Sequence, residues 1–177
     1  MKLMVEACIE HMKRAIDLAR DSYINKKGGP FGAVLVDAYD GGVLAEGQDK
    51  VFLDKDITSH AIINCIRNAS KILDCYNLYK ATDSYTINKE NNLVLFTSSY
   101  PCPMCLNALK LAGIKYVYFS ADQYASRTIG YNIDNLYYYT NYPYKFIEIK
   151  GFLNELSDEL FKEIGMKDKI PITYYDK

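Results

Sequence analysis

Apolar residues recur every three or four positions in several stretches of this chain, the spacing of one face of an α-helix. Shorter apolar runs between these stretches are typical of buried strands. The helical pattern predicts helices over residues 4–24, 60–74, 103–112, 122–129 and 152–164. The apolar runs predict strands over residues 31–36, 43–46, 93–96, 116–119 and 145–149.

The order of these elements indicates the fold class. Turn residues at 37–42 join the first two strands as a hairpin, and after it strands alternate with helices. That order predicts an α/β protein with a mixed sheet sandwiched between helices. No repeat or linker divides the chain, so we expect a single domain over residues 1–177. The polar stretch at 77–91 is expected to be a surface loop.

Composition narrows the class of protein. The net charge of −1 gives no bulk attraction to nucleic acid or to an acidic membrane. Residues 150–177 carry five lysines against six acids, so a basic C-terminal helix for binding RNA is not expected. Five cysteines form no paired framework, and charged residues interrupt the N-terminal run that a signal peptide would need. We therefore expect a cytoplasmic protein.

Candidate metal chemistry is concentrated at the starts of two predicted helices. Cys102 and Cys105 begin one of them, where the helix dipole favours thiolates, and His60 begins the other. One imidazole and two thiolates form a three-ligand set for a single Zn²⁺ and leave the fourth position for water, as in catalytic sites. The alternatives are a redox pair, or two buried cysteines with a capping histidine.

These residues and their neighbours carry a family resemblance. The sequences GGPFGAVLVD, SHA, LFTSS and PCPMCLNALKLAGIKYVYF, within about residues 10–150, resemble the zinc nucleobase and nucleoside deaminases, most nearly the bacterial guanine deaminases. The resemblance implies a cytidine-deaminase-like three-layer α/β/α sandwich with a mixed sheet of about five strands. It also implies a homodimer with one Zn²⁺ per chain, and a substrate pocket with Phe31, Asp49, Ala61 and Tyr100 in its wall. Residues 151–177 form a C-terminal helix and tail outside it.

The chain departs from the family pattern beside the zinc ligands. Where the family has the glutamate that carries protons in the reaction, this chain has Ile62, which cannot carry one. Tyr100 stands where the family usually has a glutamate before the proline, and Asp49 stands where it usually has a substrate-binding asparagine. Ala125 stands opposite an acidic residue of guanine-specific relatives. Four departures around an intact ligand set favour natural divergence of this site from the family. The alternative is that only Ile62 matters and that the other three departures are ordinary family variation.

Two groups of residues have ambiguous roles. Asp49 is the best candidate for a replacement proton carrier, whereas Asp54 and Asp56 fit solvation of a loop or the start of a helix better. The segment 116–144 holds nine of the 17 tyrosines. They suit stacking on a bound base, although compositional drift explains them slightly better. Cys8, Cys65 and Cys75 fit helix packing.

Three hypotheses follow for function. The first is a deaminase-family hydrolase with impaired or altered chemistry, acting on a purine or pyrimidine amino group. The second is a non-catalytic zinc-stabilised protein, either a base-binding protein or the partner of an active paralogue in a heterodimer. The third is a purely structural zinc protein, which would need a fourth protein ligand such as Asp49 or Cys65.

Overall fold

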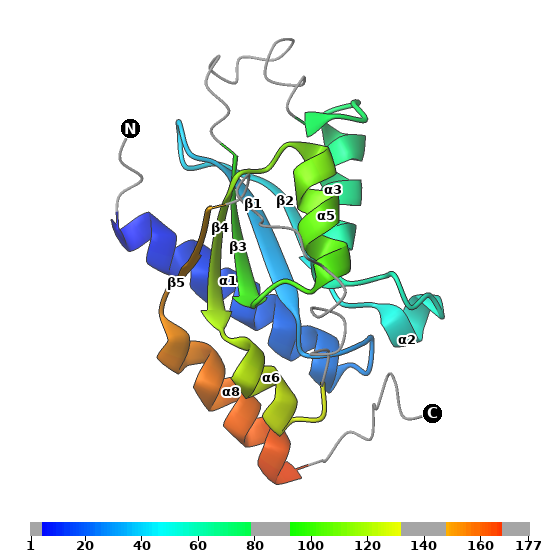
Figure 1. The fold of residues 1–177 in the computed structure, drawn as a ribbon, viewed down its shortest axis with the longest axis vertical. Helices are drawn as coiled ribbons and strands as arrows, with labels where there is room; N and C mark the ends of the chain where they lie inside the picture. The colour runs from blue at the N-terminus through cyan, green and yellow to red at the C-terminus, as the bar shows by residue number, and fades with distance from the viewer. Residues whose placement is uncertain (1–4, 79–92, 132–147, 168–177) are drawn as a thin grey trace.

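A computed structural model describes residues 5–78, 93–131 and 148–167 of the chain. Its centre is a five-stranded sheet in the order β2-β1-β3-β4-β5 (Figure 1). β1 is antiparallel to β2 and to β3, whereas β3, β4 and β5 are parallel to one another, so the predicted mixed sheet is confirmed. The strands are β1 (Gly32–Asp37), β2 (Val43–Gln48), β3 (Leu93–Ser99), β4 (Tyr116–Ala121) and β5 (Glu148–Gly151).

Helices cover both faces of the sheet, which confirms the three-layer α/β/α sandwich. α3 (Ala61–Ile72) and α5 (Pro103–Ala112) pack on one face, and α1 (Val5–Ile24) and α8 (Asn154–Lys167) lie on the other (Figure 1). Every residue of β1 and β3 is buried, because both faces of these central strands are covered. This is why the apolar residues at 33–36 and 93–96 follow one another without alternating with polar ones. No described helix is long and apolar enough to cross a membrane.

The predicted element boundaries need small corrections. Two short helices complete the described structure, α2 (Val51–Asp54) and α6 (Gln123–Thr128). The sequence pattern missed α2, because four residues are too few to show helical periodicity. Residues 148 and 149 of the predicted strand at 145–149 lie in β5. Its residues 145–147 and most of the predicted loop at 77–91 lie outside the described residues.

Close packing brings the start of α3 onto the sheet. Gly47 in β2 lies directly beneath α3, where an added Cβ would collide with the Ala61 carbonyl oxygen and the Cys65 amide nitrogen. Only glycine allows a helix and a strand to approach so closely. The close approach at Gly47 therefore helps to fix the position of His60, which directly precedes Ala61.

Candidate functional site

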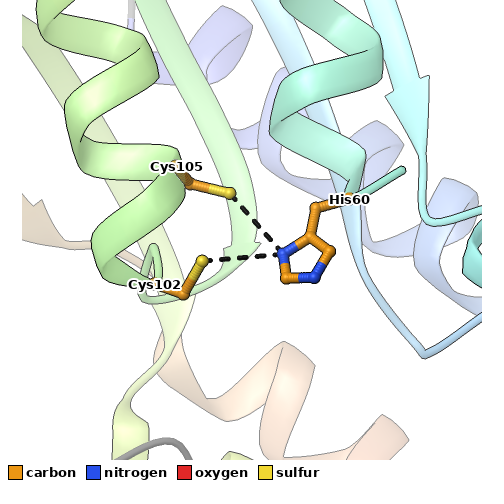
Figure 2. Close-up of side chains that lie close together, drawn as sticks. All are labelled: His60, Cys102 and Cys105. Carbon is orange, nitrogen blue, oxygen red and sulfur yellow. Dashed lines mark hydrogen bonds between the residues drawn. The ribbon is translucent and has the colours of Figure 1, made fainter. Parts of the chain in front are cut away.

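His60, Cys102 and Cys105 meet where the N-termini of α3 and α5 come together (Figure 2). The His60 Nδ1 atom lies 3.5 Å from Cys102 Sγ and 3.7 Å from Cys105 Sγ. The three ligand atoms all lie within 4.8 Å of one another. His60 thus forms one compact donor set with two cysteines that lie more than 40 positions further along the sequence.

The helix starts explain why these side chains point at one another. His60 and Cys102 are the N-cap residues of their helices and have extended backbones, with ψ of 154° and 164°. Neither side chain makes a capping hydrogen bond, so both are directed into the space between the helices (Figure 2). The alternative in which the His60 side chain caps the helix through a hydrogen bond is therefore wrong.

Electrostatics favour a thiolate at Cys102. A hydrogen bond with Cys105 lowers the pKa of the Cys102 thiol well below its usual range, and the nearby His60 ring lowers it further. The same hydrogen bond raises the pKa of Cys105, and burial adds to that rise. Burial lowers the pKa of His60, but its hydrogen bond with Cys102 and the charges of Cys102 and Asp49 outweigh burial and raise it. A zinc ion held by these three groups would take the place of the protons that they share.

The spacing of the donor atoms fits tetrahedral Zn²⁺. Zinc–sulfur bonds of about 2.3 Å and zinc–nitrogen bonds of about 2.0–2.1 Å place a nitrogen and a sulfur ligand about 3.6 Å apart. The observed separations of 3.5 Å and 3.7 Å lie on either side of that value. These two nitrogen–sulfur separations therefore match those of a zinc-bound set.

A cavity of about 220 Å³ opens beside the three ligands. The predicted pocket residues Phe31, Asp49, Ala61 and Tyr100 all line it, and so does Ile62. Ile62 is only 4% exposed and packs in the same apolar cluster as both site cysteines. An apolar side chain therefore occupies the wall where the family resemblance places a proton-carrying carboxylate.

Asp49 is the one acidic residue among the described residues that line this cavity. It is 2% exposed, and its Oδ1 accepts hydrogen bonds from the backbone N–H groups of Gly29 (2.9 Å) and Val51 (3.3 Å). Both of these bonds go to Oδ1, so Oδ2 is the oxygen available to a ligand. Burial raises the pKa of Asp49 to about 6, although His60 and the two backbone donors act in the opposite direction.

The raised pKa of Asp49 predicts how the stability of the metal-free protein depends on pH. The native state binds the Asp49 proton more tightly than the unfolded state, so the free energy of unfolding should fall as pH rises from about 4 to about 6. A rise from 3.8 to about 6 corresponds to about 3 kcal/mol of stability lost by neutral pH. The Asp49→Asn variant keeps the acceptor oxygen without the charge, so it should be the more stable protein at pH 7.

Urea denaturation of both proteins between pH 4 and pH 7.5, with a chelator present, measures this effect. The difference between the two unfolding free energies should grow across the interval in favour of Asp49→Asn. Parallel profiles would show that Asp49 ionises in the folded protein as readily as in the unfolded chain.

Several other candidate residues lie outside the ligand set. Asp54 accepts a hydrogen bond from Ser59 Oγ at 2.5 Å, and Asp56 accepts two from Thr58 at 2.7 Å and 2.8 Å. Both carboxylates thus accept hydrogen bonds within the loop before His60, which agrees with the prediction that they serve the loop and not the reaction. Cys65 is buried against β2 and its thiol donates to the Ala45 carbonyl oxygen at 3.4 Å, which gives no support to Cys65 as a fourth ligand.

Some cavity residues were missed by sequence reasoning. The hydroxyl groups of Ser99 and Ser126 lie 2.8 Å apart in the cavity wall, and Tyr131 packs edge-on against Phe31 with ring centroids 4.8 Å apart. Ala125, which the family resemblance suggested, is not among the lining residues, whereas its neighbour Ser126 is. The direction of a side chain from a six-residue helix has no signal in the sequence. Tyr131 belongs to the tyrosine-rich segment, most of which lies outside the described residues.

Comparison with known proteins agrees with this geometry. The family model for the cytidine and deoxycytidylate deaminase zinc-binding region matches residues 6–121. Guanine deaminase of Bacillus subtilis is 37% identical over 126 residues, which cover 71% of this chain and 72% of that protein. A tRNA-specific adenosine deaminase of Haemophilus influenzae is 33% identical over 57% of this chain and 51% of its own length.

Solved structures show the same fold. The crystal structure of Bacillus subtilis guanine deaminase superimposes with a TM-score of 0.64 at 36% identity, covering 76% of each chain. A structure of guanine deaminase from Nitrosomonas europaea gives a TM-score of 0.71 at 22% identity, over 88% of this chain and 83% of the other. This chain therefore belongs to the cytidine and deoxycytidylate deaminase family, and its His60, Cys102 and Cys105 cluster lies within the family's zinc-binding region.

Proposed function

We propose that this protein binds a nucleobase or nucleoside beside a zinc ion as a deaminase-family hydrolase whose proton transfer is impaired or altered. The observation that carries the proposal is the buried Ile62 side chain in the wall of the cavity that holds the ligand set. Phe31 and Tyr131 also line this cavity, and aromatic side chains suit contact with the planar ring of a base. Binding and turnover are therefore expected to be affected unequally.

The chemistry divides between the metal and the protein. A zinc ion held by His60, Cys102 and Cys105 would activate water for hydrolysis. Hydrolytic deamination also needs a group that moves protons to the ring and to the leaving amine, and Ile62 has no atom that can do so. General acid–base catalysis contributes about 10²–10⁴-fold to rates, so turnover should be slower than in a relative with glutamate at this position by at least that range.

Asp49 is our candidate for any remaining proton transfer. Its carboxylate lies in the same cavity as the ligand set, and its Oδ1 is held by the two backbone donors. A carboxylate can accept a proton from a ligand or bind an N–H group, whereas the family's asparagine can do only the second. The same residue therefore combines a substrate-binding position with a group able to carry a proton.

Guanine is the first substrate to test, because the chain is similar to a bacterial guanine deaminase over most of its length. We expect zinc-loaded protein to bind guanine, or another base of a panel with cytosine, adenine and their nucleosides, by isothermal titration calorimetry. Ammonia release from the bound compound should be slow or undetectable. Absence of binding to every member of the panel would contradict the proposal.

A non-catalytic role is the second candidate, and Ile62 favours it too, because binding does not require a proton carrier. This version predicts tight binding of a base without turnover, or copurification with an active paralogue as a heterodimer. If the protein is the hydrolase, we propose that it is a homodimer, for which light scattering should give twice the chain mass of 20.2 kDa. We also propose that the protein is cytoplasmic. None of its five cysteines forms a disulfide, and a reducing compartment such as the cytoplasm keeps cysteines in that state.

A further inference from the structure

One buried amide ties together the two chain segments that carry Asp49 and His60. Asn64 is 8% exposed and lies on α3, one turn beyond its N-cap. Its Nδ2 donates to the backbone carbonyl oxygens of Gln48 at 2.9 Å and of Ser59 at 3.1 Å. Gln48 directly precedes Asp49, and Ser59 directly precedes His60.

Other bonds show that this junction is built as a unit. The backbone N–H of Lys50 donates to the same Ser59 carbonyl oxygen at 2.9 Å, so the chain on both sides of Asp49 is joined to Ser59. The Ser59 hydroxyl lies 2.9 Å from Asn64 Nδ2 and donates to Asp54 at 2.5 Å. Asn64 adds a side chain that contacts both segments to this direct backbone bond between them.

We propose that Asn64 is a positioning residue that fixes the backbone of His60 against that of Asp49. It contacts neither the donor atoms nor the cavity, and acts through the carbonyl groups of the two preceding residues. The inference goes beyond the proposed function, because it rests on the metal site and holds whether or not the cavity binds a base. No sequence motif points to it, since the asparagine gains its role only when β2 and α3 pack together.

The physical reason is that an imidazole ligand must be held in place before the metal arrives. The loop before His60 has no regular structure of its own, so side-chain bonds to its carbonyl groups set its position. Partners that orient metal ligands from outside the coordination sphere typically change metal affinity by about 10–100-fold. Asn64 acts one residue away from His60, so we expect the lower end of that range, about tenfold.

Asn68 provides a matched control on the same helix. Its Nδ2 donates to the Glu46 carbonyl oxygen at 2.8 Å, so it makes the same kind of bond between α3 and β2, one turn further on. Neither Glu46 nor Asn68 adjoins a ligand or lines the cavity. Removing the Asn68 amide therefore measures the effect of losing one α3–β2 hydrogen bond without changing a bond to the segments that carry Asp49 and His60.

The experiment compares Asn64→Leu with Asn68→Leu in the full chain. Dissociation constants for Co²⁺ and Zn²⁺ are measured by titration against a chromophoric chelator, and the Co²⁺ absorption bands report the geometry of the ligands. Thermal melts of the metal-free proteins show how much stability each variant loses. The Asn64→Ala variant removes both N–H donors without adding charge or bulk, and it replaces Asn64→Leu if that variant does not fold.

The proposal predicts about tenfold weaker metal binding and shifted Co²⁺ bands for the Asn64 variants. Asn68→Leu should bind both metals within twofold of the wild-type affinity, with unchanged bands. Wild-type affinity in the Asn64 variants would overturn the assignment. Equal losses of affinity at positions 64 and 68 would also overturn it, because they would show a general effect of helix packing.

Discussion

Replacing Ile62 with glutamate is expected to raise the rate of ammonia release from a bound base by at least about 100-fold. Ile62 lies in the cavity wall with the three zinc ligands and is almost fully buried, so a carboxylate there would reach the same space. The change restores the group that the family resemblance assigns to proton transfer. A coupled ammonia assay on zinc-loaded Ile62→Glu, with guanine first and the other bases after it, measures the effect.

The matched control for this experiment is Ile62→Gln, which has the same shape as glutamate but cannot carry a proton. It should show the wild-type rate. A thermal melt of each variant checks that the buried polar group leaves the domain folded, since burial of a polar side chain is costly. If folded, zinc-loaded Ile62→Glu turns over none of the bases, the cavity has lost more than its proton carrier, and the impaired-hydrolase version is wrong.

Replacing Cys105 with serine is expected to remove zinc from the purified protein. Structural zinc sites with four ligands bind with about 10–16 kcal/mol, or about 2.5–4 kcal/mol per ligand, so losing one thiolate should weaken binding by about 10²–10³-fold. Inductively coupled plasma mass spectrometry should find about one zinc per wild-type chain and almost none per Cys105→Ser chain after dialysis.

Cys65→Ser is the matched control for the loss of a thiol, because Cys65 is also a buried cysteine on a helix. Its Sγ donates to the Ala45 carbonyl oxygen, a bond that a serine hydroxyl can also make. Burial raises the pKa of Cys65 to about 12, which makes it a poor source of thiolate. The control should keep its zinc. Loss of zinc from Cys65→Ser, or its retention in Cys105→Ser, would assign the metal to a different ligand set.

Much of the fold could be predicted from the sequence because local signals agree with the packing. Apolar spacing marks α1, α3 and α5 because each buries one face on the sheet. The zinc ligands could be predicted for a similar reason, since two cysteines at a helix start restrict metal geometry locally. A helix such as α2 escaped because its four residues depend on backbone bonds from Phe52 and Leu53 to the Lys27 carbonyl oxygen, far back in the chain.

The parts of the site that could not be predicted depend on tertiary contacts. Ser99 and Ser126 come together only when β3 and α6 meet. Asn64 reads as an ordinary polar residue of an amphipathic helix until the carbonyl groups of Gln48 and Ser59 are seen beside it. The burial of Asp49 likewise follows from folding, because it requires the backbone of Gly29 and of Val51 around one carboxylate.

X-ray absorption spectroscopy of the zinc-loaded wild-type protein tests the central claim most directly, because it counts the sulfur ligands on the metal. The geometry of His60, Cys102 and Cys105 predicts two sulfur atoms at about 2.3 Å, with an imidazole nitrogen and one further light atom at about 2.0–2.1 Å. A metal with three or four sulfur ligands, or with none, would contradict the account.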